Sequence, residues 1–432
     1  MFRRRLIIKL QQLIFDLNDS FPLMGKPLLR GWSIFHRLKF IFGKYSRELR
    51  GKLNYSVLTI DLNKIFWVNP EKINLLLDSK VRTPINDSKI LRGNWDRSTR
   101  KYTDSEIYKS FKQRYKDGII WEKTIYYNNL LHETSKLKKK KMFESKEELD
   151  NKFNKFDHLY NHLKNLKIEK KFNYHRWAEI VGNQSITDEI VVNIGRNGQL
   201  LLIEGQSLLF LTKILNFKHI PIKIRTRHKK WIKFKKDLEY FSRQGKLYQK
   251  IEHPDLQNFP FKYGDTRLKL IEEKISRRNG TLLDIGANLG YFCHNFEDLG
   301  FDCYAIEVNP IYIYFLKKLK KAESKKFKII TDSIFCYKKN DDLIFDIVLA
   351  LNVFHNLIIR KKTYLKLIKF LNRLKVKELY FGAHNPNELK NIYTYRNFTP
   401  NQFTNFILKN SDLNNVEFIG KTSDGRTLYK LT

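Results

Sequence analysis

The sequence of 432 residues contains only three cysteines, and no two of them have the Cys-x-x-Cys spacing of zinc knuckles and redox motifs. Cys293, Cys303 and Cys336 therefore predict neither a disulfide framework nor a metal site. The sequence also lacks an uninterrupted apolar run long enough to span a bilayer. Together these absences favour a protein of the reducing cytoplasm that has no transmembrane segment and no metal.

Acidic residues are scarce relative to basic ones, with 45 Asp and Glu against 82 Lys and Arg, which gives a formal net charge of +37. The apolar fraction of 42% is that of a folded protein, and the excess positive charge is concentrated in the first 245 residues. This imbalance suits an anionic partner, such as nucleic acid, a membrane surface or an acidic glycan. The alternative is compositional drift, because Lys, Asn, Ile and Phe are abundant throughout the chain.

Residues 1–55 contain two stripes of apolar residues at helical spacing among basic residues. The stripes consist of Leu6, Leu10, Leu13 and Leu17, and of Trp32, Phe35, Leu38, Ile41 and Phe42. They predict two basic amphipathic helices. Such helices either lie on an anionic membrane surface, which would make the protein peripheral to a membrane, or dock on their own domain.

Residues 56–245 form the second predicted region, an α+β domain whose most informative part is residues 188–231. There a strand at 189–194, a hairpin turn at 196–198, a strand at 200–203, a helix after Gly205 and a strand at 222–224 follow in order. This order resembles the ParB-like, sulfiredoxin-type fold. The family's Gly-x-His-Arg motif is degenerate here, because Gln206, Ser207 and Leu208 follow the glycine. We therefore expect a scaffolding or binding unit without nucleotide hydrolysis.

A basic cluster at residues 225–230, next to Trp231, follows the last strand of this unit. Two interpretations remain open for it. Either it meets a phosphate group of a partner, or it is the charged exit of an edge strand.

The stretch from Thr281 to Pro310 organises the third region, residues 246–432. The apolar run at 282–285 predicts a buried strand, a glycine turn follows it, and a helix over 291–299 leads to a second strand at 303–306. Glu307 stands at the tip of that second strand. A strand, glycine loop, helix and strand in this order predict a βαβ unit with a ligand crevice at the carboxyl ends of its strands.

The glycine turn departs from the Gly-x-Gly-x-x-Gly fingerprint of dinucleotide sites. Its pattern is Asp284-x-Gly286-x-Asn288-x-Gly290, and a carboxylate at its start would repel a pyrophosphate but could hold an ammonium group. With Glu307 placed to bind ribose hydroxyls, the stretch resembles motif I of class I S-adenosylmethionine (SAM) methyltransferases, in the FkbM-like form. Asn288 replaces the commoner middle glycine. The alternative is a structural turn in another α/β domain.

This resemblance implies a doubly wound, Rossmann-like α/β sheet that ends in an antiparallel hairpin, here expected at 416–431. It also implies a SAM site that includes Asp284, Gly286, Asn288, Gly290 and Glu307. Asp332, after a strand at 327–330, would bind the adenine amino group, and Asn352 would complete the site after a strand at 345–351. A leading segment with aromatic residues would cover the cofactor.

Two histidines follow the predicted fourth and fifth strands, where such enzymes carry out their chemistry. His355 has an ordinary pKa of about 6.5 and is the first candidate for a general base, with His384 as the second. The alternative for His355 is a structural role. The sequence thus predicts a methyltransferase acting on an oxygen of a small-molecule, glycan or lipid acceptor.

The rival hypothesis is a protein that binds nucleic acid or another anionic polymer, with a SAM-binding domain of regulatory or lost activity. Methylases of nucleic-acid amines usually have an Asn/Asp-Pro-Pro-aromatic motif after the fourth strand. This chain has Asn352-Val-Phe-His355 there, which argues against that chemistry.

Overall fold

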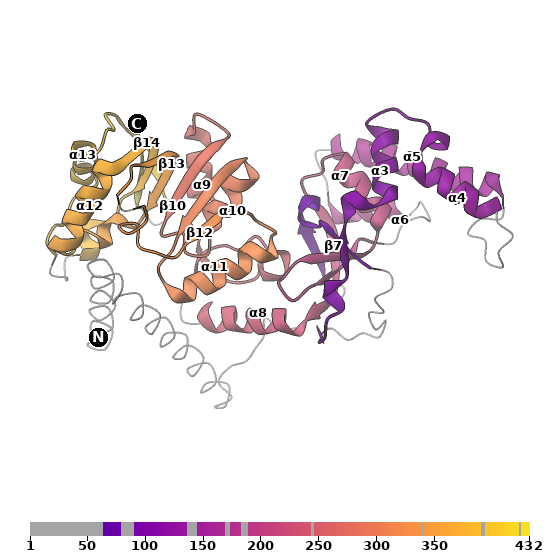
Figure 1. Cartoon of the computed structure of the whole chain (residues 1–432), viewed down its shortest axis with the longest axis horizontal. Helices are drawn as coiled ribbons and strands as arrows, with labels where there is room; N and C mark the ends of the chain where they lie inside the picture. The colour runs from indigo at the N-terminus through magenta and orange to yellow at the C-terminus, as the bar shows by residue number, and fades with distance from the viewer. Residues whose placement is uncertain are drawn as a thin grey trace. The chain divides into compact units, whose positions relative to one another are not determined.

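The computed structural model describes residues 64–78, 90–135, 145–168, 173–182, 189–242, 246–338, 340–389, 394–422 and 425–432. They divide into two compact units (Figure 1). The N-terminal unit contains Leu58–Lys236 and Ala322–Ser324, and the C-terminal unit contains Asp237–Lys321 and Lys325–Thr432. The two amphipathic helices predicted in residues 1–55 lie outside the described residues.

The C-terminal unit is built on a sheet with the strand order β12-β11-β10-β13-β14-β16-β15. The strands are β10 (Gly280–Ile285), β11 (Phe301–Ile306), β12 (Lys328–Ile330), β13 (Leu343–Leu351), β14 (Leu374–Gly382), β15 (Val416–Lys421) and β16 (Thr427–Leu431). The first five are parallel, whereas β16 runs antiparallel to both β14 and β15. The strand order reverses between β10 and β13, which is where open α/β sheets bind their ligands.

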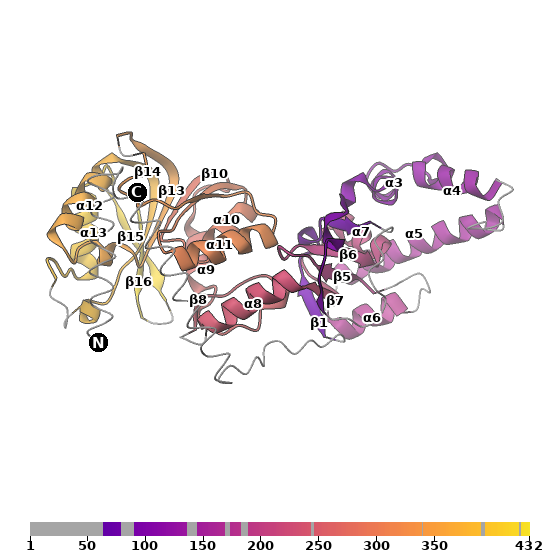
Figure 2. The same ribbon diagram turned by 60° about the horizontal axis from the view of Figure 1, so that its bottom comes forward.

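Helices cover both faces of this sheet, as Figures 1 and 2 show. One face carries α9 (Thr266–Lys274), α10 (Tyr291–Asp298) and α11 (Pro310–Ala322), and the other carries α12 (Lys361–Arg373) and α13 (Pro400–Lys409). Successive residues of β10 point to opposite faces, so Leu282 joins the core under α10, whereas Leu283 and Ile285 join the core under α12 and α13. The predicted doubly wound α/β fold with its antiparallel final hairpin is confirmed.

A short two-stranded sheet precedes this fold in the chain. Its parallel strands are β8 (Leu247–Gln249) and β9 (Phe261–Tyr263), and β9 leads directly into α9. This is the predicted leading segment. It carries Tyr248 and Tyr263, whose rings meet edge to face with centroids 4.8 Å apart.

The N-terminal unit contains a mixed sheet with the strand order β1-β7-β5-β6-β2-β4, and β3 also pairs with β7. The strands are β1 (Ile65–Val68), β2 (Leu75–Leu77), β3 (Ile90–Leu91), β4 (Thr99–Lys101), β5 (Val191–Ile194), β6 (Leu200–Glu204) and β7 (Ile220–His228). The helices are α3 (Glu106–Tyr115), α4 (Ile125–Ser135), α5 (Lys146–Ile168), α6 (Tyr174–Gly182), α7 (Gln206–Ile214) and α8 (Lys229–Ser242), which continues into the other unit. Within the described ranges, no helix combines the length and apolarity that crossing a membrane requires.

The predicted order of elements after residue 188 is confirmed. β5 and β6 form an antiparallel hairpin, and α7 begins directly after Gly205, which has the positive φ of 79° that favours glycine. Of the two interpretations of the basic cluster, the exit of an edge strand does not hold, because β7 lies between β1 and β5. β7 extends to residue 228 and ends in three buried residues at 226–228, so the first part of the cluster lies on this strand, and Lys229 and Lys230 begin α8.

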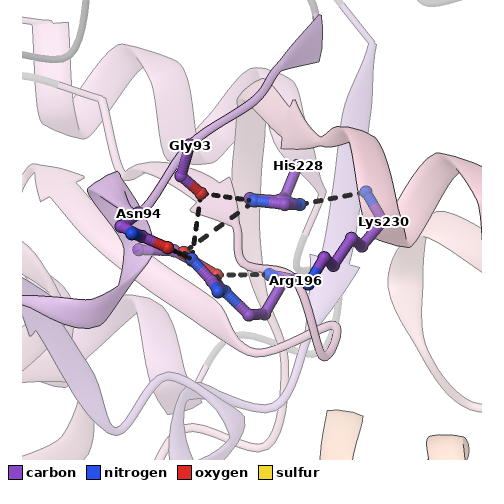
Figure 3. A network of polar contacts seen from close by, with 6 residues as sticks. Gly93, Asn94, Arg196, His228 and Lys230 are labelled. Carbon is purple, nitrogen blue, oxygen red and sulfur yellow. Dashed lines mark hydrogen bonds and ion pairs between the residues drawn. The ribbon is translucent and has the colours of Figure 1, made fainter.

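Part of the basic cluster therefore packs inside the unit, whereas Lys229 and Lys230 are exposed. Arg227, His228 and Trp231 are buried, and Arg225 forms an ion pair of 2.6 Å with Glu204. Figure 3 shows Arg196 and His228 converging on the carbonyl of Gly93, which accepts from Arg196 Nη2 at 2.9 Å and lies 3.0 Å from His228 Nε2. These contacts tie the loop before β4 to the central strand.

Candidate functional site

The glycine turn after β10 has three residues with positive φ. They are Gly286 at 76°, Asn288 at 54° and Gly290 at 84°. A Cβ atom at Gly290 would lie 2.4 Å from Leu316 Cδ1, so only glycine fits there. Asn288 tolerates this conformation better than most side chains, and its Oδ1 accepts a hydrogen bond from the backbone N–H of Leu289. The unusual Asn288 is thus accommodated by the turn.

Glu307 follows β11 and holds this turn through its carboxylate. Oε2 accepts from the backbone N–H of Asn288 at 2.8 Å, and Oε1 accepts from those of Val308 and Asn309 at 2.9 and 2.8 Å. Burial raises the pKa of Glu307 to about 7, against the lowering effect of these three donors. An ionised carboxylate offers about four acceptor positions, so Glu307 retains capacity on Oε2 for a ligand hydroxyl.

Asp284 is the second buried acid of the site and belongs to β10. It is only 3% exposed and faces α10, where Cys293 Sγ lies 3.9 Å from its Oδ2. Burial raises its pKa to about 7, with a further rise from the negative charge of Glu307 and an opposing effect of the positive charge of Arg267. Two buried acids with elevated pKa values near the carboxyl ends of neighbouring strands are typical of a functional site.

Asn352 lies directly after β13 with a φ of 60°, at the point where the strand order reverses. Its amide faces Arg267, Arg426 and Tyr248. Because guanidinium groups can only donate, the facing atom must be the oxygen. Asn352 Oδ1 then accepts from Arg267 Nη1 at 3.2 Å, Arg426 Nη1 at 3.0 Å and Tyr248 Oη at 2.9 Å.

Neither arginine was predicted from the sequence, although Arg267 left one signal. It lies four residues before Ile271 on the buried face of α9, where a basic residue is unexpected. Its guanidinium stacks over the rings of Tyr263, Tyr248 and Phe292, at 4.5, 5.3 and 5.8 Å from their centroids. The aromatic residues of the leading segment thus contact Arg267, where we had expected them to cover the cofactor.

The remaining predicted residues lie after their strands as expected. His355 is half-buried in a short 3₁₀ turn after β13, and His384 is buried after β14. Their rings stack with centroids 5.2 Å apart, so the structure brings the two base candidates together. His384 Nε2 also lies 3.3 Å from Asn397 Oδ1. Asp332 is exposed, two residues after the end of β12.

Comparison with protein-family models gave no match, and comparison with curated proteins gave none either. Among solved structures, the bifunctional kinase-methyltransferase WbdD matches 44% of this chain and 45% of its own, with 18% identity and a TM-score of 0.39. The chain thus aligns with less than half of WbdD.

Two smaller proteins match 38% of this chain. One, assigned as an S-adenosylmethionine-dependent methyltransferase from Listeria monocytogenes, is covered over 96% of its length, with 15% identity and a TM-score of 0.30. The other, a ribosomal-protein methylase from Lactobacillus delbrueckii subsp. bulgaricus, is covered over 75%, with 14% identity and a TM-score of 0.28.

Proposed function

We propose that the C-terminal unit binds SAM and transfers a methyl group to an oxygen of a small-molecule, glycan or lipid acceptor. The observation that carries this proposal is the pair of buried acids near the carboxyl ends of β10 and β11, next to the point where the strand order reverses. Glu307 holds the glycine turn through the N–H of Asn288, and Asp284 lies in the adjacent strand. Such a pair of acids is suited to a ligand that combines ribose hydroxyls with positive charge.

Each acid has a distinct role in this proposal. Glu307 would accept a ribose hydroxyl on the position that remains free on Oε2. Asp284, once ionised, would attract the ammonium group of the ligand, and Asp332 would accept from the adenine amino group. Gly286 and Gly290 hold the left-handed backbone of the turn, where a Cβ atom would meet Val353 and Leu316 respectively.

SAM, when bound, would supply a methyl group that its positively charged sulfur makes electrophilic. The protein must then align the acceptor and remove the proton of its hydroxyl group. His355 and His384 stack beside one another at the ends of adjacent strands, and a ring nitrogen of His355 would take that proton. Because the imidazoles lie in contact, the individual variants must decide which of them is the base.

Isothermal titration calorimetry with SAM and S-adenosylhomocysteine tests the first step. We expect both to bind, and we expect NADH to fail because Asp284 opens the turn. Binding of NADH without SAM would make the unit a dinucleotide-binding domain. If none of the three ligands binds, the turn is a purely structural connection and the proposal is refuted. Transfer of a labelled methyl group from SAM to small-molecule, glycan or lipid fractions then identifies the acceptor class.

A further inference from the structure

The two arginines around Asn352 form a positively charged group that the methyl-transfer chemistry leaves unused. Arg267 Nη1 and Arg426 Nη1 lie 3.2 and 3.0 Å from the same amide oxygen. Two guanidinium groups so close together repel one another, and the amide oxygen that they share belongs to a neutral group. The arrangement gains most from an additional negative charge at this place.

Arg267 provides an independent indication of an absent anion. Its side chain is 3% exposed, yet its Nη2 is buried and has no hydrogen-bond partner among the residues that the structure describes. Buried polar groups are almost always paired, because an unpaired donor carries a desolvation penalty without compensation. The stacked rings of Tyr263, Tyr248 and Phe292 fix the orientation of the guanidinium but accept no strong hydrogen bond.

Deepening the proposed function, on which this inference rests, we propose that Arg267 and Arg426 bind an oxyanion, a carboxylate or phosphate group, beside Asn352. A guanidinium presents two parallel N–H groups that match the two oxygens of such a group. The oxyanion would take up the unpaired Nη2 of Arg267 and replace part of the contact with Asn352 Oδ1.

Two ligands could supply this oxyanion. One is SAM itself, whose amino-acid end carries a carboxylate next to the ammonium group that Asp284 attracts. The proximity of opposite charges on Asp284 and Arg267 suits such a zwitterion. The other is the methyl acceptor, because Arg426 lies between the strands of the final hairpin and Asn352 lies three residues before His355.

The first arm of the test compares S-adenosylhomocysteine with its decarboxylated analogue by calorimetry. If the cofactor supplies the oxyanion, the unmodified protein should prefer the carboxylated ligand by roughly tenfold to hundredfold. In Arg267→Met, which keeps the apolar stem, this preference should fall below about threefold, and in Arg267→Lys it should be intermediate. Arg426→Met should also lower the preference for the carboxylated ligand. Arg277→Met, at an arginine paired with Asp346 near the start of β10, is the matched control.

The second arm adds acetate or inorganic phosphate to the protein saturated with S-adenosylhomocysteine and measures the shift of the thermal transition. Stabilisation that Arg267→Met and Arg426→Met both abolish, but Arg277→Met retains, would assign the oxyanion to the acceptor. A ligand preference and an anion effect that are both insensitive to Arg267 and Arg426 would overturn the inference and leave these residues structural. If Arg267→Met does not fold, Arg267→Lys and Arg426→Met decide.

The two proposals fail separately. Absence of binding by S-adenosylhomocysteine refutes the proposed function. The anion titration is then run on the protein alone, where stabilisation by phosphate or acetate that depends on both arginines would still support the oxyanion site.

Discussion

Replacing the buried acid Asp284 by asparagine should change how the stability of the C-terminal unit depends on pH. Burial raises the pKa of Asp284 to about 7 from its ordinary value of 3.8, so the folded unit keeps a proton that the unfolded chain releases. A raised pKa contributes stability that is fully present below pH 3.8 and is lost as the pH rises through about 7. A tenfold change in a group's acid dissociation constant corresponds to about 1.4 kcal/mol, so the loss in free energy of unfolding is roughly 2–4 kcal/mol.

Asp284→Asn cannot ionise and should therefore lose much less stability over this range. Asp346 does not obscure the difference between the two proteins. Hydrogen bonds from Lys377 and the backbone of Thr281 lower the pKa of Asp346 to about 2, so its contribution disappears only as the pH falls toward that value. Both proteins share that contribution. The pKa of Glu307 is also about 7, close to that of Asp284. The difference in free energy of unfolding between the unmodified protein and Asp284→Asn, measured at each pH, therefore contains the effect of Asp284 together with its coupling to Glu307.

Urea unfolding at about pH 5 and about pH 8, followed by far-ultraviolet circular dichroism, measures the effect. Five of the six tryptophans, at positions 67, 95, 121, 177 and 231, belong to the N-terminal unit, so tryptophan emission reports mainly on that unit and provides an internal reference in the same experiment. Asp302→Asn, an exposed acid on β11, is the control variant and should follow the unmodified protein. If the stability of Asp284→Asn changes between about pH 5 and about pH 8 as much as that of the unmodified protein, Asp284 ionises in the folded unit at little cost. Our account of the site's electrostatics would then be wrong.

Three further results should follow. Glu307→Gln loses a charged acceptor of the turn and of the ligand, so calorimetry should show SAM affinity reduced roughly tenfold to hundredfold, whereas unchanged affinity would exclude a ribose contact. Gly290→Ala places a Cβ atom 2.4 Å from Leu316 Cδ1 at a φ of 84°, and urea unfolding should show a stability loss of roughly 1–3 kcal/mol; an unaltered midpoint would mean that α11 moves freely. His355→Ala should retain SAM affinity while methyl transfer falls at least roughly a hundredfold, with a smaller fall for His384→Ala; a larger loss at His384 would make that residue the base.

The sequence was sufficient to predict the sheet of the C-terminal unit because its signals are local. Leu282, Leu283 and Ile285 form a short apolar run, and strands of a parallel sheet covered on both faces are apolar throughout. The turn at 286–290 could also be predicted from the sequence, because few residue types other than glycine and asparagine adopt a left-handed backbone conformation. Each of these features depends on residues that are neighbours in the chain.

Contacts between distant segments could not be predicted in the same way. Arg426 reaches Asn352 only because β16 pairs with β14, and Tyr248 reaches it from a strand far earlier in the chain. The edge-strand alternative for the basic cluster at 225–230 does not hold, for a related reason. Whether a strand is central or at an edge depends on which strands pair with it, and β1, far away in sequence, pairs with Ile220–Lys223 on the side of β7 opposite β5.

The charges of the candidate site distinguish between its plausible ligands more sharply than the glycine turn does. Asp284 and Glu307 form an acidic side, and Arg267 lies close enough to Asp284 to oppose the rise of its pKa. A dinucleotide would bring two negative phosphates toward the acidic side, where they would raise the free energy of every ionised carboxylate. A ligand with ribose hydroxyls, a positive sulfur and a zwitterionic end instead places positive charge beside Asp284 and its carboxylate toward Arg267. The same electrostatic argument therefore supports both the proposed cofactor and the oxyanion site.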